Sequence, residues 1–411
     1  MRLTFVIQRY GEGVVGGAES YVESMATGFA EDGHEVDVVT SCATSYADWA
    51  DVFEPGTSVE RGVTLHRFPV RAPRDNDRFV PLHLRTVDQR QEPVWPWSQD
   101  RWSQVMGPDL LGVEAPLAAL AAASDATVLV GYHYSHTQRL TGLAAAHGPT
   151  VVVPTAHPEG AFHVGYVRRM FEHADRVVCL APEEGDLIAD VAGCGDRIDH
   201  VPCPVAPIPV PDDAAIDAAV RSVGATRGRY AVVVGRIDPA KGSDDAVAFA
   251  NRYRRFVDPG FELVVIGPGG GTGPLGDAVR PTGFVDEDVK RALVAGSAVV
   301  LQPSYMESFS LALVEGWLLR RPALVQGASR VLRGHVERSG GGLAYAGYDS
   351  FEAALATVLT RPDVAARLAA AGEAYSRREF DRARVGPAFL DAVARAGSHG
   401  RARLDQEAAA R

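Results

Sequence analysis

Two glutamates flank a mostly apolar stretch in the second half of the chain, MESFSLALVEGW at residues 306–317. The aliphatic run before it, Ala298–Ser304, predicts a buried strand, so Glu307 falls in the loop that follows this strand. The residues from about Ser310 onward suit a helix, which carries Glu315. Because eight helical residues span about 12 Å, the two carboxylates are too far apart to share one proton or one water molecule. We expect them to contact two different parts of one long ligand.

The start of the predicted helix offers backbone N–H groups between the two glutamates. If Ser308 and Ser310 flank this start, the N–H groups near Phe309, Ser310 and Leu311 have no acceptor within the helix. Such groups suit phosphate oxygens, because a helix N-terminus also carries about half a positive charge. The alternative is that Glu307 only caps the helix and Glu315 only lies on its surface.

A second segment, GRIDPAKG at residues 235–242, adds two cations. A predicted strand, Tyr230–Gly235, ends just before Arg236, and Lys241 precedes a predicted helix near Gly242–Phe256. Two cations beside a helix N-terminus suit a polyanion, most simply a diphosphate, although two solvated surface cations would give the same sequence. The segment is not a Walker A loop, because G-x-x-x-x-G-K-[ST] is absent.

Together the two segments predict a site for a nucleotide-sugar. The cations would neutralise the diphosphate, and one carboxylate would meet the sugar hydroxyls. The other carboxylate would accept from both ribose hydroxyls, and each such charge-assisted hydrogen bond contributes about 1.5–3 kcal/mol.

The elements that must position these residues alternate between strands and helices. Strand-like runs at 3–8 and 35–41 enclose a helical pattern at 18–34, which predicts a βαβ unit. The remaining strand-like runs lie at 126–132, 150–156, 176–181, 230–235, 261–267, 298–304 and 322–327. This alternation predicts parallel sheets with helices on both faces.

A proline-rich segment, Val201–Asp213, divides the chain because prolines at this density forbid both helix and central strand. The expected fold is therefore α/β, with two Rossmann-like doubly wound domains facing across a cleft that holds the ligand. We expect an acceptor-side domain at 1–203 and a nucleotide-sugar domain at 204–372. A helical segment at 373–411 should pack back toward the first domain and end in a frayed tail.

Composition, charge and cysteine spacing argue against several classes of protein. The chain has 411 residues, with 46% hydrophobic and 23% charged residues, which is ordinary for a globular protein of two domains. A net charge of −11 argues against a nucleic-acid partner. The four cysteines show no C-x-x-C spacing, no apolar run is long enough for a membrane span, and the N-terminal run is too short for a signal peptide. We expect a cytoplasmic protein.

GRIDPAKG followed by ESFSLALVE resembles the retaining glycosyltransferases of family 4, which have the GT-B fold. The resemblance spans nearly the whole chain. GGAESYVESMATGFAEDGHEVDVVTS resembles the family's opening loop and first helix, VVPTAHPE its central histidine segment, and PTGFVDEDVKRALVAGSAVVLQPSYMESFS its nucleotide-side run. TSCATSYADWADVFEPG with VTLHRFPVRAPRD is similar to transferases of polysaccharide and O-antigen sugars.

The resemblance implies a metal-independent retaining hexosyltransferase. It would move a sugar from a UDP-, GDP- or ADP-sugar, which is a co-substrate rather than a cofactor, to a glycan, lipid-linked or small-molecule acceptor. Arg236 and Lys241 would neutralise the diphosphate, His157 would lie near the transferred sugar, Glu307 would contact that sugar and Glu315 would hold the ribose diol. The other implied substrate-binding residues are Gly16, Gly17, Gly283, Phe284, Val285, Ser308, Phe309, Ser310 and Leu311.

The sequence departs from the family pattern at two points. The family often has aspartate after the central histidine, whereas this chain has Pro158 and then Glu159. After the second glutamate the family usually continues with a small, glycine-containing turn, whereas this chain has GWLLRRPALV, with Trp317 and Arg320–Arg321. These departures affect the expected donor sugar and the contact made by His157.

Other functions remain open on the sequence. GEGVVG, Gly11–Gly16, matches a dinucleotide-binding fingerprint, but the acidic residue expected at the end of the second strand is missing, since Asp37 comes too early. DED at 286–288 matches a metal-binding D-x-D signature, but N-capping by Asp286 explains it better. A nucleotide-sugar epimerase or hydrolase on the same fold, or an inert nucleotide-sugar-binding module, would share the remaining signals.

Two features of the first domain could serve an acceptor. His133 and His136 follow a predicted strand end, where they could touch the acceptor or simply form a satisfied polar loop. Five arginines give a basic bias that could dock an acidic lipid-linked acceptor or a membrane surface, or be a solvated face; they are Arg71, Arg74, Arg78, Arg85 and Arg90.

Overall fold

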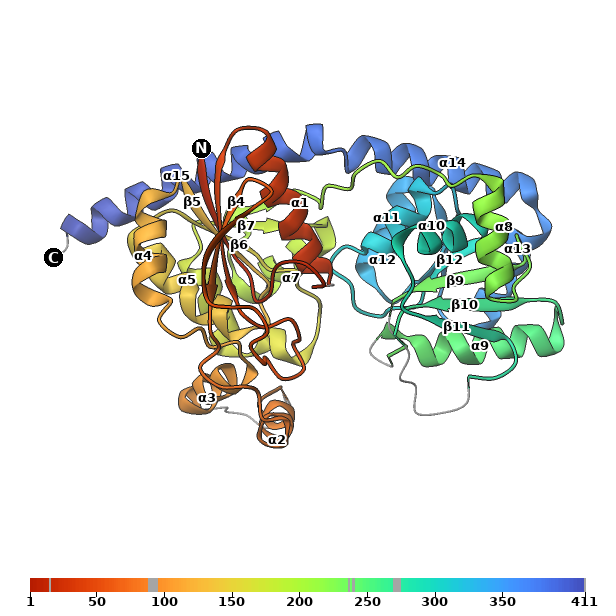
Figure 1. Cartoon of the computed structure of the whole chain (residues 1–411), viewed down its shortest axis with the longest axis horizontal. Helices are drawn as coiled ribbons and strands as arrows, with labels where there is room; N and C mark the ends of the chain where they lie inside the picture. The colour runs from red at the N-terminus through yellow and green to blue at the C-terminus, as the bar shows by residue number, and fades with distance from the viewer. Residues whose placement is uncertain (15, 88–94, 236, 239–240, 269–274, 410–411) are drawn as a thin grey trace. The chain divides into compact units, whose positions relative to one another are not determined.

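The computed structural model describes residues 1–14, 16–87, 95–235, 237–238, 241–268 and 275–409. The chain divides into two compact units (Figure 1). The first unit contains Met1–Pro204 together with Arg382–Arg411, and the second contains Val205–Asp381. Residues 373–381 thus belong to the second unit, and the chain returns to the first unit at Arg382.

The first unit is built on an eight-stranded sheet with the order β3-β4-β2-β1-β5-β6-β7-β8. All neighbouring strands are parallel except β3 and β4, which pair antiparallel. The strands are β1 (Arg2–Val6), β2 (Glu35–Ser41), β3 (Gly56–Glu60), β4 (Val63–Phe68), β5 (Ala126–Val130), β6 (Thr150–Val153), β7 (Arg176–Cys179) and β8 (Ile198–His200).

Helices connect these strands. They are α1 (Gly17–Glu31), α2 (Asn76–Val87), α3 (Pro96–Met106), α4 (Glu114–Ala123), α5 (Ser135–His147), α6 (Gly165–His173), α7 (Pro182–Ala192) and α15 (Arg382–Ala409), with 3₁₀ turns η1 (Gly160–His163) and η2 (Gly195–Arg197). Because successive strand residues face opposite sides of a sheet, β1 serves two cores. Val6 packs with residues of α4 and α5, while the Phe5 ring stacks 6.2 Å from Phe389 of α15.

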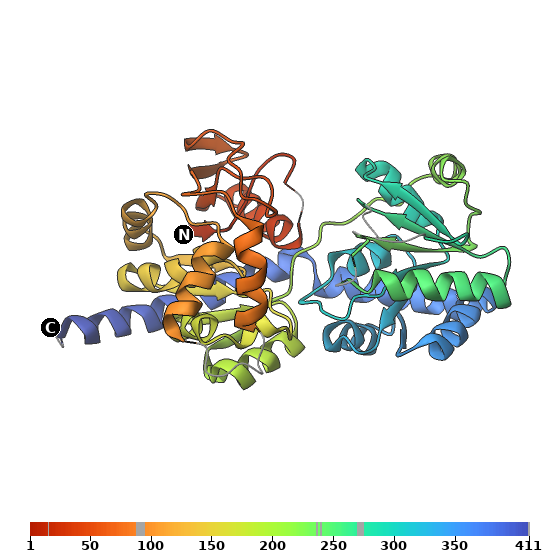
Figure 2. The same ribbon diagram turned by 90° about the horizontal axis from the view of Figure 1, so that it is seen from below.

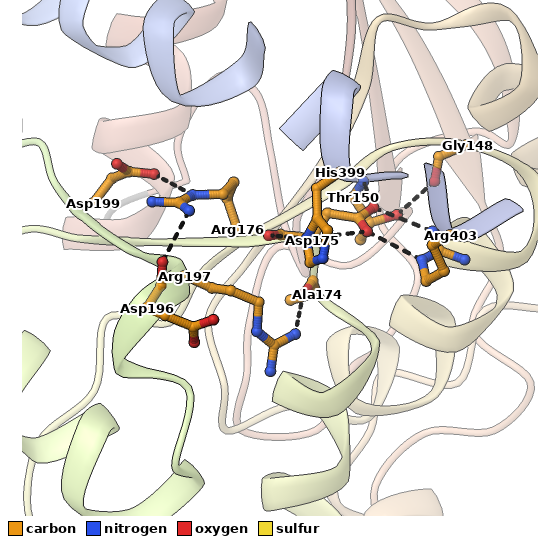
Figure 3. Close-up of polar contacts among 10 residues, drawn as sticks. All are labelled: Gly148, Thr150, Ala174, Asp175, Arg176, Asp196, Arg197, Asp199, His399 and Arg403. Carbon is orange, nitrogen blue, oxygen red and sulfur yellow. Dashed lines mark hydrogen bonds and ion pairs between the residues drawn. The ribbon is translucent and has the colours of Figure 1, made fainter. Parts of the chain in front are cut away.

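The C-terminal helix α15 is held to this sheet by buried charge. The Asp175 carboxylate, which is 1% exposed, accepts from Arg403 at 3.0 and 3.1 Å and from the Thr150 backbone N–H at 2.9 Å (Figure 3). Nearby, Arg395 of α15 donates to Asp199, which also accepts from Arg176. Helix α15 extends from Arg382 to Ala409.

The second unit contains a six-stranded, all-parallel sheet with the order β11-β10-β9-β12-β13-β14. Its strands are β9 (Tyr230–Val234), β10 (Glu262–Ile266), β11 (Val279–Gly283), β12 (Val299–Gln302), β13 (Ala323–Gln326) and β14 (Gly342–Tyr345). Its helices are α8 (Asp213–Ser222), α9 (Ser243–Phe256), α10 (Glu287–Gly296), α11 (Leu311–Leu318), α12 (Arg330–Ser339), α13 (Tyr348–Thr360) and α14 (Pro362–Glu379).

Helices cover both faces of this sheet, as expected for a doubly wound fold (Figures 1 and 2). One core joins alternate strand residues such as Val233 and Leu263 to α9 and α13. The other joins Val232 and Val264 to α8 and α10. The α/β class and the two Rossmann-like sheets predicted from the alternating pattern are confirmed, and most strands are a few residues shorter than their apolar runs because the flanking residues lie in loops.

Candidate active site

Two of the predicted donor-side residues, Lys241 and Glu307, lie where the two halves of the second sheet meet. β9 pairs with β10 on one side and with β12 on the other, so the strand order reverses direction between β9 and β12. In doubly wound sheets, ligands bind outside the carboxyl ends of the strands at such a switch point. The loop after β9 carries Lys241, and the loop after β12 carries Glu307. The topology therefore brings these two predicted residues to one place.

A glycine allows these loops to approach each other. Gly242 precedes α9 with a φ of 69°, and a Cβ atom placed on it would lie 2.0 Å from the carbonyl oxygen of Pro303. Only glycine tolerates both this backbone angle and this distance. Beside this contact, Lys241 Nζ lies 2.9 Å from Glu307 Oε1. The predicted diphosphate-binding cation and the predicted sugar-binding carboxylate therefore form an ion pair.

A second lysine–carboxylate pair lies at the same end of the sheet. Lys290 of α10 places its Nζ 3.1 Å from Glu315 Oε2 and 2.9 Å from Glu287 Oε2. Burial lowers the pKa of Lys290, but the two carboxylates outweigh it and raise that pKa above its ordinary value. Lys290 is thus charged and fixes Glu315. The sequence prediction missed Lys290; its only signal was the Glu287–Lys290 spacing of three, which is typical of a helix-surface pair.

Helix α11 begins at Leu311, close to the predicted start. Ser310 is the N-cap residue, with an unusual φ of 83° and no capping bond from its side chain. Ser308, Ser310 and Leu311 are half-buried. Residues 307–310 are not helical, so the predicted 12 Å separation, which assumed eight helical residues, does not describe the path from Glu307 to Glu315.

The loop between β12 and α11 is anchored by its aromatic residue. The buried Phe309 ring lies edge-on to His335, 5.4 Å away, and to Phe380, 5.1 Å away. Burial lowers the pKa of His335 to about 3, so this imidazole is neutral at ordinary pH. The side chain of Phe309 thus belongs to the interior, which leaves the backbone as the part of this residue that a ligand could contact.

The atypical residues after Glu315 have a packing role. Trp317 is fully buried, and its Nε1 donates to the Gly341 carbonyl at 2.8 Å. A Cβ atom on Gly372 would lie 2.2 Å from Trp317, so this glycine makes room for the indole. Arg320 pairs with Glu373 at 3.1 Å, and Arg321 donates to the Ser297 carbonyl at 3.1 Å. Through these contacts, Trp317, Arg320 and Arg321 hold the C-terminal end of α11 against the rest of the second unit.

The remaining donor-side predictions fall at the edge of the sheet or outside the described residues. Gly283 ends the edge strand β11 with a φ of 70°, followed by the exposed Phe284 and the half-buried Val285. Strands β10 and β9 separate them from the Lys241–Glu307 pair, at the same end of the sheet. Arg236 lies outside the described residues.

In the first unit, Gly16 and Gly17 begin α1 directly after the β1 loop. A Cβ atom on Gly16 would lie 2.1 Å from Glu19 Oε2, so a larger residue would displace this carboxylate. Glu19 is buried and accepts from Arg9 Nε at 2.9 Å and from Gln8 Nε2 at 3.0 Å. The first turn of α1 is thereby tied to the end of β1, which lies at the switch point of this sheet, between β2 and β5.

The predicted histidine His157 lies beyond the carboxyl end of β6. Its Nδ1 is 3.7 Å from Glu159 Oε1, the same oxygen that lies 3.0 Å from His133 Nδ1. His157 and His133 thus both lie near the carboxylate of Glu159, which is one of the residues that depart from the family pattern. His136 is enclosed in α5 at 2% exposure, so it does not belong to this cluster.

The D-x-D segment has a local structural role. Asp286 is the N-cap residue of α10 by position, but its side chain makes no capping hydrogen bond, so the expected side-chain cap is wrong. Glu287 instead pairs with Lys290 and Arg291. Across the described ranges, no group of three or more histidine, cysteine, aspartate or glutamate residues is placed to hold a metal ion.

Known protein families match both units of the chain. Residues 15–207 match the family model described as Glycosyltransferase Family 4, and residues 228–361 match the one described as Glycosyl transferases group 1. The chain is 26% identical to glycogen synthase of Mycobacterium tuberculosis, covering 93% of this chain and 91% of the relative. It is 28% identical to D-inositol 3-phosphate glycosyltransferase of Nocardia farcinica, covering 79% and 73%.

The fold has solved counterparts as well. The structure of Anabaena HepE in complex with UDP and glucose superposes with a TM-score of 0.68 at 14% sequence identity, covering 95% of this chain and 98% of that one. The two Rossmann-like units thus have the GT-B fold. The chain belongs to the glycosyltransferases of family 4.

Proposed function

We propose that this glycosyltransferase is a retaining, metal-independent hexosyltransferase that uses a nucleoside-diphosphate sugar. The observation that carries the proposal is the pairing of two lysines with the two glutamates at the carboxyl ends of the second sheet, Lys241 with Glu307 and Lys290 with Glu315. HepE has been solved with UDP and with UDP-glucose, which supports a UDP-sugar as the first donor to test.

The proposed chemistry depends on stabilising the leaving group. As the sugar becomes oxocarbenium-like, negative charge grows on the diphosphate. Lys241, with the predicted partner Arg236 and the N-terminus of α11, would supply positive potential there, and each such group could lower the barrier by a few kcal/mol. Glu307, released from Lys241 by the diphosphate, would then accept from sugar hydroxyls. In a front-face attack, a donor phosphate oxygen would take the acceptor proton.

We propose that Glu315 holds the ribose. Lys290 orients this carboxylate, whose two oxygens can accept hydrogen bonds from both ribose hydroxyls. Gly283, Phe284 and Val285 would lie along the base, and the exposed Phe284 ring offers a surface for stacking. These residues and the two glutamates are distributed along the same end of the sheet, as an extended ligand would require.

The first unit would receive a glycan, lipid-linked or small-molecule acceptor. The α2–α3 segment exposes four large apolar side chains, Val80, Leu84, Trp95 and Trp97, together with Arg78, Arg85 and Arg101. Tryptophan and arginine side chains suit the headgroup region of a membrane, so we propose that this segment contacts an anionic lipid surface. None of the helices in the described part of the chain is both long and apolar enough to cross a membrane.

We place the enzyme in the cytoplasm, where nucleotide-sugars would be its substrates. All four cysteines are buried and none is disulfide-bonded, which supports a reducing compartment.

The proposed function is tested first by donor screening. Purified protein is heated with UDP-, GDP- and ADP-sugars, and a donor present at a hundred times its Kd should add about 2.7 kcal/mol to the free energy of unfolding. The stabilising donor is then incubated with candidate acceptors, with and without EDTA, and the product anomer is read by NMR. Retained configuration with undiminished rate in EDTA is expected. Donor conversion without acceptor, or no binding to any donor, would overturn the proposal.

A further inference from the structure

Several ionisable groups of the first unit surround one carboxylate oxygen, away from the donor-side residues. Glu159 Oε1 accepts from the Tyr132 hydroxyl, lies 3.0 Å from His133 Nδ1 and lies 3.7 Å from His157 Nδ1. Tyr132 and His133 follow β5, whereas His157 and Glu159 follow β6, and these strands are neighbours in the sheet. One carboxylate therefore joins two loops at the carboxyl edge of the sheet.

The backbone of the second loop is fixed in an unusual conformation. Thr155 has a φ of 50°, which is strained for a β-branched residue. The next residue, Ala156, donates its N–H to the buried Glu184 carboxylate at 2.5 Å, and the Glu159 N–H donates to the His157 carbonyl at 2.8 Å. Strain held in place by surrounding contacts is a feature of functional sites, because it fixes the direction of the side chains that follow.

Protonation states follow from the contacts. Burial raises the pKa of Glu159, but His133 and the other partners outweigh it and lower that pKa to about 2, so the carboxylate is ionised and can only accept. His133 must then carry a proton on Nδ1, which makes Nε2 the acceptor nitrogen of the neutral ring. The neighbouring His83 has the opposite tautomer, because Trp102 Nε1 donates to its Nδ1 at 3.1 Å.

We propose that Glu159 is the positioning residue of the acceptor side, which fixes Nδ1 as the protonated nitrogen of His133 and so reserves Nε2 of this ring for a sugar hydroxyl. Glu159 Oε1 is already shared by Tyr132 and His133, and the Glu159 side chain is only 27% exposed, so its role is to orient the His133 ring. This assignment rests on the proposed function for the reaction that the ring would serve.

Other charged and ionisable groups face the same cluster. From the β5–α5 loop these are Tyr132 and Tyr134; from α2 and the segment before it, they are His83 and Arg74. Burial and the neighbouring His133 lower the pKa of His83, which favours its neutral ring.

The first experiment measures the rings and does not need activity. The full-length protein, labelled with ¹⁵N-histidine, is examined by NMR as wild type, as Glu159→Gln and as Glu172→Gln, a control at an exposed glutamate of α6. The ¹⁵N shifts of the two ring nitrogens should report the Nδ1–H form of His133 in the wild type and in Glu172→Gln, and Glu159→Gln should lose this preference. The His133 resonances are assigned with His133→Gln. An unchanged His133 tautomer in Glu159→Gln would overturn the proposal.

The second experiment measures catalysis. Glu159→Gln should reduce kcat for transfer at least about tenfold, with the KM for the donor little changed. Glu159→Asp should restore part of kcat and part of the Nδ1–H preference of His133, and it replaces the glutamine variant if that variant does not fold. Full transfer activity in Glu159→Gln would refute the role. If the wild type transfers no sugar, the proposed function fails, while the NMR spectra still decide whether Glu159 positions the His133 ring.

Discussion

Lys241 and Glu307 stand 66 positions apart in the sequence, and their side chains meet at 2.9 Å. The loops that carry them follow the neighbouring strands β9 and β12 and touch through Gly242 and Pro303. This ion pair joins the two sequence motifs, GRIDPAKG and MESFSLALVEGW. The close approach of the two loops depends on Gly242, where no larger side chain fits.

Gly242→Ala should therefore separate these loops. A methyl group 2.0 Å from the Pro303 carbonyl oxygen must push one loop away, in addition to the strain of a φ of 69°. We expect a loss of more than about 2 kcal/mol in the free energy of unfolding and a transfer rate lowered at least about tenfold. The control is Gly340→Ala, because Gly340 has a φ of 63° but a Cβ atom placed on it would lie 3.8 Å from its nearest neighbour. Equal effects of both variants on transfer would show that loop contact is irrelevant.

Lys290→Gln should weaken donor binding, because Glu315 loses the cation that orients it. The expected change is a donor KM raised about tenfold or more, with a smaller effect on kcat, since the ribose is bound alike in ground and transition states. Arg291→Gln is a matched control, because Arg291 is the next residue of α10 and pairs with Glu287 and Asp288. Initial rates over a donor series give both constants. A KM that is the same in Lys290→Gln and Arg291→Gln would argue against Glu315 as a ribose ligand.

Trp317→Ala should lower the free energy of unfolding by about 3–5 kcal/mol, because it empties a fully buried site. Gly372→Ala should also be destabilising, since its methyl group would overlap the indole. In the double variant the methyl group enters the space left by the indole, so the two costs should fall short of their sum by about 1 kcal/mol or more. Denaturant unfolding of the four proteins measures this coupling. Strict additivity would show that Gly372 does not accommodate Trp317.

Acid should destabilise the second unit through His335. Burial lowers the pKa of this imidazole to about 3, whereas it is about 6.5 in the unfolded chain. Between these values the unfolded state binds the extra proton, so stability falls as the pH drops, by up to about 1.4 kcal/mol per pH unit. His335→Phe keeps the aromatic packing with Phe309 and should flatten this part of the profile. The exposed His147, changed to Gln, should leave the profile as in the wild type.

The proposed lipid contact predicts vesicle binding that depends on the α2–α3 segment. The double variant Trp95→Ser/Trp97→Ser should bind phosphatidylglycerol vesicles several-fold more weakly than the wild type in co-sedimentation, because both indoles are more than 60% exposed. Phe256→Ser, which removes an equally exposed ring from α9, is the control. Neutral phosphatidylcholine vesicles should bind less than anionic ones. Wild-type protein that ignores both kinds of vesicle would contradict the contact.

The sequence alone determined the two doubly wound sheets, because buried parallel strands and amphipathic helices leave periodic apolar patterns that need no long-range information. It also indicated that Lys241, Glu307 and Glu315 belong to one end of one sheet, because residues after consecutive parallel strands must emerge at the same edge. The family resemblance could be stated for the same reason, since its motifs are local. Arg236, which the sequence placed with them, lies outside the described residues.

Which side chains touch was decided by tertiary structure. In the sequence, Glu287 and Lys290 show only the spacing of three that is typical of a helix-surface pair. The fold places Lys290 against Glu315 as well. Glu159 seemed only a departure from a motif, yet its carboxylate joins loops from two strands, and its contact with His133 spans 26 positions in the sequence. Trp317 departs from the family pattern, and the two glycines that make room for it, Gly341 and Gly372, lie 24 and 55 positions further along the sequence. Periodicity reports how a segment faces its own core, and it carries no information on which distant segment supplies the partner.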